Sequence, residues 1–337
     1  MTMLNRKSLA LAIILAVIMG LLTSENAMAC ASCGCMLNTD MTGSFSGQPG
    51  LRMDLRWDYI NQDQLRSGTG TISPVAASQK ENNGMSQEVE KYTVNNFVTL
   101  GIDYSEPTWG VNAQIPYINK SHETLGTASD GYVAGPGGGQ YFSSTGDLGD
   151  IKVVGRYTGF TEEHNLGLRF GFKLPTGSHL ETGVSTDPTA PGPVPIDRGL
   201  QPGSGTTDII FGPFYSNSIN MNWSYFAQAL FQKALYSCDQ YRSGESYNVS
   251  IGTIYSGISG VVPQLQLNFR HVLRDTGDQA DIFSTGGTLL YVSPGASVPI
   301  SYNSSVYAFI QLPLYQDLRG VQLAPTFTTS IGIRYSF

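Results

Sequence analysis

The chain has 337 residues, enough for one large all-β domain or two ordinary domains. Its formal net charge of -7 argues against nucleic acid as a partner. Charged residues make up only 13% of the chain, whereas it holds 39 glycines and 18 tyrosines. This composition fits a water-soluble enzyme poorly and suits a protein in which apolar and small polar residues alternate.

Residues 1–29 have the features of a secretory signal peptide. Arg6 and Lys7 precede the apolar run LALAIILAVIMGLL (9–22), and the small residues AMA (27–29) provide a cleavage-type ending. No other stretch of the sequence has the roughly 18 consecutive apolar residues that a spanning helix needs. We therefore predict a cleaved signal peptide, which would export the mature chain to an oxidising compartment.

The segment LRMDLRWDYI (51–60) indicates the fold class. Its odd-numbered residues are apolar, whereas Arg52, Asp54, Arg56 and Asp58 are charged, so the two sets occupy opposite faces of one strand. Similar alternation predicts further strands at 92–104, 109–117, 150–157, 166–174, 207–215, 223–232, 247–255, 264–272, 288–293, 305–314 and 326–337.

The connections between these strands alternate in length. Long ones fall near 62–90, 119–146, 175–206 and 235–246, and short ones lie between them. Short turns on one side and long loops on the other are typical of outer-membrane barrels. We predict an all-β fold, a transmembrane antiparallel β-barrel of about 12 strands over residues 51–337. A soluble β-sandwich is the rival.

The end of the chain supports the barrel. In the final strand, Ile331, Ile333, Tyr335 and Phe337 share one face, and the terminal Phe337 is expected to be the signal that the outer-membrane assembly machinery recognises. We therefore expect the outer membrane of a Gram-negative bacterium, with both termini periplasmic and with membrane lipid and a small solute as further partners. The sequence gives no oligomeric state.

Five stretches together resemble one known family. They are GDLGDIKVVGRYT (146–158), FKLPTGS (172–178), LQPGSGTTD (200–208), FSTGGTLLYVSPG (283–295) and FIQLPLYQDLRGVQLAP (309–325). They resemble the outer-membrane transporters named for the meta pathway of phenol degradation, which are distantly similar to long-chain fatty-acid channels. The resemblance covers roughly residues 50–337 and implies a barrel that takes up hydrophobic or aromatic small molecules. The insert at 179–199 and the cysteine-rich N-terminus lie outside these motifs.

If the apolar faces contact lipid, the opposite faces line the lumen. The basic candidates are Arg52, Arg56, Lys91, Lys152, Arg156, Arg169, Lys173, Arg270 and Arg334, and the acidic ones are Asp54, Asp58, Asp103, Asp150 and Asp208. Inward aromatic candidates are Phe97, Phe214, Phe226, Tyr307 and Phe309. Two interpretations stay open: the charges select a small aromatic or fatty-acid anion, or they form ion pairs that hold the strands together.

Catalytic chemistry is not predicted. Of the four histidines (His122, His164, His179 and His271), none has metal-ligand spacing to another. His271 is the one on a predicted strand, and it has no identifiable serine partner for a hydrolase triad. The chain is therefore not expected to be an enzyme.

The stretch CASCGCML (30–37) holds Cys30, Cys33 and Cys35, and the fourth cysteine, Cys238, falls in a predicted long loop. Residues 30–50 are expected to be a periplasmic segment able to plug the barrel. Three uses of the cysteines stay open: a local disulfide, acylation of Cys30, or zinc or copper(I) binding by C-x-x-C-x-C. A disulfide to Cys238 would thread the segment through the lumen. No other cofactor is expected.

Three functions follow from these patterns. The first is an outer-membrane channel for small hydrophobic, aromatic or anionic solutes. The second is a barrel that mounts the cysteine segment as a metal-binding or periplasmic docking module. The third is a structural or adhesive barrel that acts through its long outer loops.

Overall fold

The structure is a computed structural model that describes residues 49–82, 85–86, 89–124, 140–186 and 191–337. The predicted signal peptide and Cys30, Cys33 and Cys35 lie outside the described residues. Within the described part, no helix combines the length and apolar character needed to cross a membrane.

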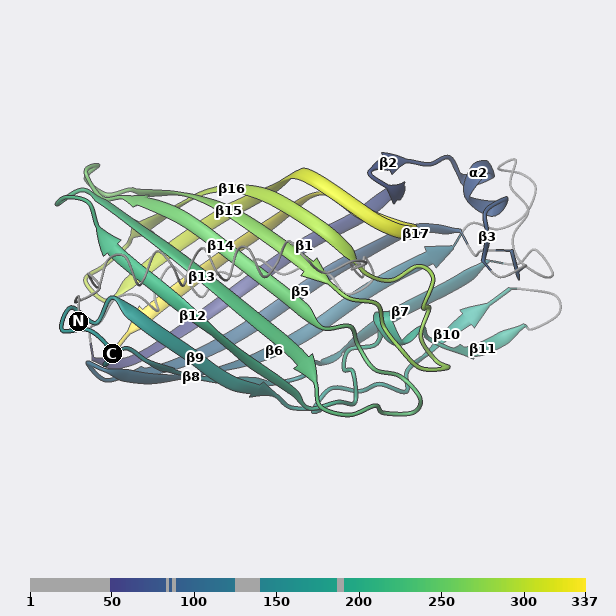
Figure 1. Cartoon of the computed structure of the whole chain (residues 1–337), viewed down its shortest axis with the longest axis horizontal. Coiled ribbons are helices and arrows are strands. Elements are labelled where there is room, and N and C mark those ends of the chain that lie inside the picture. The colour runs from purple at the N-terminus through teal and green to yellow at the C-terminus, as the bar shows by residue number, and fades with distance from the viewer. Residues whose placement is uncertain (1–48, 83–84, 87–88, 125–139, 187–190) are drawn as a thin grey trace, which may run out of the picture.

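Eleven strands close into one antiparallel barrel, each hydrogen-bonded to the next, with β6 paired to β8 to complete the ring (Figure 1). They are β1 (Gly50–Gly68), β5 (Glu90–Ser105), β6 (Trp109–Thr124), β8 (Lys152–Tyr157), β9 (Leu166–Lys173), β12 (Asp208–Ser218), β13 (Trp223–Ala234), β14 (Ser246–Tyr255), β15 (Val262–Val272), β16 (Gly287–Pro299) and β17 (Ser304–Ser336). Closure leaves no unpaired edge in the ring. This is required in lipid, where every backbone N–H and C=O group must have a hydrogen-bond partner within the protein. The predicted barrel class is confirmed.

The strand β17 crosses the barrel twice. Its residues 305–318 pair with β16, and its residues 318–336 pair with β1. The chain reverses next to Gly320, which has the left-handed φ of 60° that glycine adopts without strain. At the opposite end, the Ser336 N–H donates to the Asn303 carbonyl at 2.8 Å. With this reversal the described chain traverses the barrel twelve times, and the predicted strands 305–314 and 326–337 both extend into residues 315–325.

Shorter elements extend the long-loop end, at the right of Figure 1. The strands there are β2 (Gly70–Thr71), β3 (Glu81–Asn82), β4 (Met85–Ser86), β7 (Tyr141–Leu148), β10 (Thr182–Ser185) and β11 (Gly192–Pro195), and the helical turns are α2 (Pro74–Ser78) and η3 (Arg198–Leu200). The predicted long connection at 119–146 is corrected, because β6 continues to Thr124 and β7 pairs with this extension. The short turns and the C-terminus lie at the other end.

The barrel is apolar outside and polar inside. In β9, Leu168 and Phe170 are 49% and 52% exposed, whereas Arg169 between them is 5% exposed. The same contrast holds in β15, where the exposed Leu265 alternates with the buried Gln266. This is the reverse of a soluble sandwich and matches a wall with lipid on its outer face.

Aromatic side chains gather at the short-turn end. The ring centroids are 5.8 Å apart in the Tyr104–Trp109 pair and 4.7 Å apart in the Trp223–Tyr255 pair. Both pairs flank short turns on the outer surface of the barrel. An aromatic girdle is expected where a barrel meets the headgroup region of a bilayer.

The outer face predicts how the barrel tolerates charge. Phe170 lies in the middle of β9 on the apolar face, so Phe170→Arg should lower the free energy of unfolding from lipid vesicles by roughly 2–4 kcal/mol. Urea titration of tryptophan fluorescence measures this change. Met221→Arg is the matched control, because Met221 is 98% exposed in a turn. Equal effects of the two substitutions would contradict the assignment of the lipid face.

Candidate functional site

The sequence-predicted lumen residues are mostly enclosed by the barrel. Eight are buried: Arg52, Arg56, Asp58, Asp103, Asp150, Arg169, Lys173 and Asp208. Five are half-buried: Asp54, Lys152, Arg156, Arg270 and Arg334. Lys91 differs, since its side chain is 45% exposed beside a register shift in β5, where it forms an ion pair with Glu123.

Near the short-turn end, two arginines share one carboxylate. The Asp103 oxygens accept from Arg52 and from Arg156, each at 2.8 Å. Ser105 accepts from both guanidinium groups and donates to Asp103 at 2.6 Å. The two cations and one anion come from β1, β5 and β8, so this cluster links three strands and keeps a surplus positive charge.

A second ion pair lies on the neighbouring strands. Asp54 accepts from Arg334 at 3.3 Å and from the Tyr307 hydroxyl at 2.8 Å. The Arg334 guanidinium also lies over the Tyr307 ring, 5.4 Å from its centroid. Here the structure supports the strand-linking interpretation of the inward charges.

The inward aromatic side chains lie along the wall. The Phe214 ring covers Gly167, so closely that a Cβ on the glycine would be 2.3 Å from it. Three further inward rings cover glycines in the same way: Phe226 over Gly252, Phe309 over Gly295, and Tyr307 over Gly332. Packing an aromatic ring over a strand glycine fills the gap left by the missing side chain. It also directs the ring along the wall.

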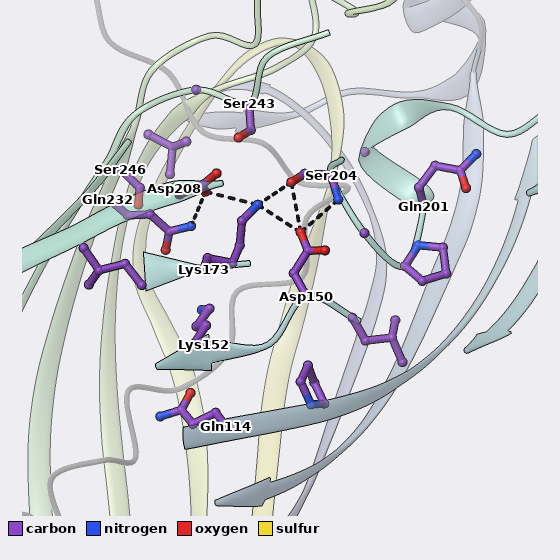
Figure 2. Close-up of a pocket in the computed structure, with 18 of the residues that line it drawn as sticks. Gln114, Asp150, Lys152, Lys173, Gln201, Ser204, Asp208, Gln232, Ser243 and Ser246 are labelled. Carbon is purple, nitrogen blue, oxygen red and sulfur yellow. Dashed lines mark hydrogen bonds and ion pairs between the residues drawn. The ribbon is translucent and has the colours of Figure 1, made fainter. Parts of the chain in front are cut away.

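The quoted motifs converge on one buried cluster, which we call the Lys173 cluster (Asp150, Lys173, Ser204 and Asp208). The Lys173 ammonium lies 3.0 Å from Asp150 and 3.1 Å from Asp208, and it donates to the Ser204 hydroxyl (Figure 2). Asp150 also accepts from the backbone N–H groups of Gly177 at 3.1 Å and Ser204 at 3.0 Å. The cluster therefore ties two loop segments to the barrel wall.

These bonds draw residues 198–204, which we call the inner loop, onto the end of the lumen. Lys120 on β6 donates to the carbonyls of Gly199 at 3.1 Å and Gln201 at 3.3 Å. The Gln201 amide donates in turn to the carbonyls of Glu181 and Ile196. The inner loop is thereby fixed to the wall and to its own neighbours, and it narrows the long-loop end.

A cavity of about 300 Å³ lies between the inner loop and the barrel wall, and we call it the basic cavity. Seven cationic side chains line it: Arg56, Lys120, Lys152, Arg169, Lys173, Arg198 and Arg270. The acidic groups among its described lining residues are Asp150, Asp208 and Asp275. Apolar groups such as Phe97, Ile210 and Val272 lie between the charges. Its size is at the small end of the range for ligand pockets.

A second cavity of about 100 Å³, the acidic cavity, lies at the long-loop end and shares Arg198, Gly199, Tyr241 and Asp275 with the first. Its lining includes Glu90, Asp197, Asp275 and Asp281. Burial raises the pKa of Asp275 to about 6, although Tyr241 and Gly244 donate hydrogen bonds to it. Burial, followed by the charge of Asp281, raises the pKa of Asp197. This cavity therefore gains negative charge as pH rises through about 6.

Sequence reasoning missed several of these groups. Lys120 and Arg198 fall in segments that were predicted to be loops, and Asp275 follows the last residues of a predicted strand. The available signal was weak: a single Arg in the Gly/Pro-rich stretch IDRGLQPG, and a Lys three residues beyond a predicted strand end.

The sequence matches no protein-family model, and no curated protein is a significant match to it. Among solved structures, the chain is similar to an outer-membrane channel from Pseudomonas putida F1, with a TM-score of 0.57 and 11% identity over 86% of this chain and 96% of that one. Lower TM-scores are found for the CymD monoaromatic hydrocarbon channel (0.48, 11% identity, 93% and 98% covered) and the transport unit of the autotransporter AIDA-I from Escherichia coli (0.49, 12%, 91% and 95%).

At these identities the first similarity shows the fold alone: this chain has the β-barrel fold of an outer-membrane channel. The resemblance to the meta-pathway transporters stays a prediction, because no family model matches the sequence.

Proposed function

We propose that the chain is an outer-membrane channel for small solutes that combine an apolar body with a negative charge. The basic cavity carries this proposal, since its described lining holds seven cationic groups against three carboxyl groups, with apolar side chains between them. An aromatic or short fatty acid anion has this chemistry, because its carboxylate can pair with an arginine while its hydrocarbon part covers the apolar wall.

Not all of the cations contribute equally to the field in the cavity. Lys173 lies between two carboxylates, and Arg56 pairs with Asp58 at 2.7 Å. Arg169 donates to the neutral Gln228 amide at 3.0 Å, and Arg270 donates to the neutral Asn248 amide at 3.4 Å. A hydrogen bond to a neutral amide does not cancel the charge of Arg270, so Arg270 is the best candidate to attract an anion.

The orientation follows from the same proposal. The long loops would face the cell exterior and the short turns would face the periplasm. The C-terminus, which lies at the short-turn end, would then be on the periplasmic side. Phe337 is 67% exposed and packs edge-on against Tyr335 at 4.8 Å, so its ring is accessible to the assembly machinery. The resemblance to meta-pathway transporters supports an aromatic solute. The docking alternative depends on Cys30, Cys33 and Cys35, outside the described residues.

Charge reversal in the cavity tests anion preference. Arg169→Glu and Arg270→Glu should each lower the anion-to-cation permeability ratio by roughly a few-fold or more, because each replaces a positive charge with a negative one in a partly enclosed space. The measurement is the reversal potential of the purified barrel in a planar bilayer under a salt gradient.

Two further variants calibrate this test. Lys80→Glu, on an exposed loop, should leave the reversal potential unchanged. Arg156→Glu should act less strongly than Arg270→Glu, because Arg156 already pairs with Asp103. Unchanged potentials for both cavity variants would contradict anion selection and leave the charges with a structural role.

The inner loop predicts a conductance change. Lys120→Met removes the ammonium that holds the Gly199 and Gln201 carbonyls, so the loop should move from the lumen and single-channel conductance should rise. Arg270→Met is the matched control, because it removes one positive charge from the same cavity without touching these carbonyls. A conductance of Lys120→Met equal to or lower than that of the wild-type protein would show that the inner loop does not limit the opening.

A further inference from the structure

Three metal-ligating side chains that do not line the basic cavity meet at the long-loop end. His179 follows the LPTG stretch, and Cys238 and Asp239 lie in the connection after β13. The distance from Cys238 Sγ to His179 Nε2 is 3.7 Å, and the distance from Cys238 Sγ to Asp239 Oδ2 is 3.5 Å. His179 Nε2 lies 3.2 Å from the same carboxylate oxygen. The three donor atoms thus form a compact triangle.

The triangle has the dimensions of one face of a zinc coordination tetrahedron. Zinc binds nitrogen and carboxylate oxygen at about 2.0–2.2 Å and sulfur at about 2.3 Å. A tetrahedron with these bond lengths has edges of about 3.4–3.6 Å between its donor atoms. The observed separations of 3.2, 3.5 and 3.7 Å agree to within a few tenths of an ångström.

The backbone holds two of the donors in a rigid turn. Cys238 and Tyr241 exchange two backbone hydrogen bonds, each 2.9 Å long. Between them, Asp239 and Gln240 have φ of 46° and 57°, a left-handed conformation that non-glycine residues seldom adopt. Such strain persists only where the surroundings enforce it, and it is common at ligand sites.

Other residues join the two segments that supply the donors. Arg198 donates to the carbonyl of His179 at 2.9 Å and to that of Cys238 at 3.2 Å, so one guanidinium fixes both ligand backbones. Gly205, with φ of 72°, lies against the cluster, and a Cβ there would be 2.7 Å from the Cys238 sulfur. A larger residue would displace the thiol, so glycine is needed for the triangle to form.

We propose that His179, Cys238 and Asp239 form a zinc site with three protein ligands and a fourth position for water or a solute donor. A nitrogen, a sulfur and an oxygen donor are the ligand types that zinc accepts in such open sites. Binding replaces the hydrogen bonds among the three side chains and releases the Cys238 thiol proton to solvent. The ion would then link the segment that precedes the inner loop to the turn after β13.

Cobalt(II) substitution tests the site in the full-length barrel. The test uses a Cys30→Ser, Cys33→Ser, Cys35→Ser background, so that Cys238 is the remaining thiol. Titration should give one Co²⁺ per chain with a thiolate-to-metal charge-transfer band and tetrahedral d–d absorption, and Zn²⁺ should displace it. Adding Cys238→Ser, a near-isosteric change, should abolish the charge-transfer band, and adding His179→Gln should weaken Co²⁺ binding at least about tenfold.

A matched control and two contrary results make the test decisive. His164→Gln, at another loop histidine, should leave the titration unchanged, and heat-modifiable gel migration confirms that each variant is folded. Absence of a thiolate band in the folded triple-serine protein would overturn the proposal. A disulfide between Cys238 and an N-terminal cysteine in the wild-type protein, found by non-reducing peptide mapping, would also overturn it.

Discussion

The ammonium of Lys173, enclosed between Asp150 and Asp208, is the contact on which the long-loop end depends. The three side chains are 9%, 8% and 2% exposed, so each charge is compensated by the others and by hydrogen bonds. Removing one partner from such a group leaves a buried charge uncompensated, at a cost of about 3–5 kcal/mol. Because Asp150 also binds two loop N–H groups, the same charges that stabilise the wall hold the inner loop in the lumen.

Alternation was enough to predict the faces of the barrel. Arg169 and Lys173 were placed inside by their position in one short strand, because side-chain parity is a local property of extended chain. The contacts that shape the opening are not local: Lys120 binds a carbonyl 79 residues away, and His179 meets a thiol 59 residues away. Contacts between residues so far apart in the chain leave no periodic pattern in the sequence. The Gly- and Pro-rich segments that make them were therefore predicted only as loops. Lys91 shows the limit of this alternation, since it lies at a register shift between Glu90 and Tyr92.

The two cavities differ in charge although they share Arg198, Gly199, Tyr241 and Asp275. The basic cavity borders the barrel wall. The acidic cavity lies at the start of β5 and the end of β6, beside the connection that precedes β16. An anion approaching past Glu90 and Asp281 would meet repulsion before it reached Arg169 and Arg270. Since the pKa of Asp275 is raised to about 6 by burial, part of this repulsion is lost in mildly acidic solution. Under the proposed function, this arrangement would favour anions with a sizeable apolar part over small inorganic anions, because only the former gain from the apolar wall.

Arg198 connects these features. Its guanidinium lies 5.2 Å from the centroid of the Tyr241 ring, contacts the carbonyls of His179 and Cys238, and lines both cavities. Tyr241 in turn donates to Asp275 at 2.9 Å. A displacement of the turn at Cys238 would therefore reach the inner loop through one side chain. Arg198 therefore contacts both segments of the proposed zinc site directly, and Tyr241 connects it to Asp275.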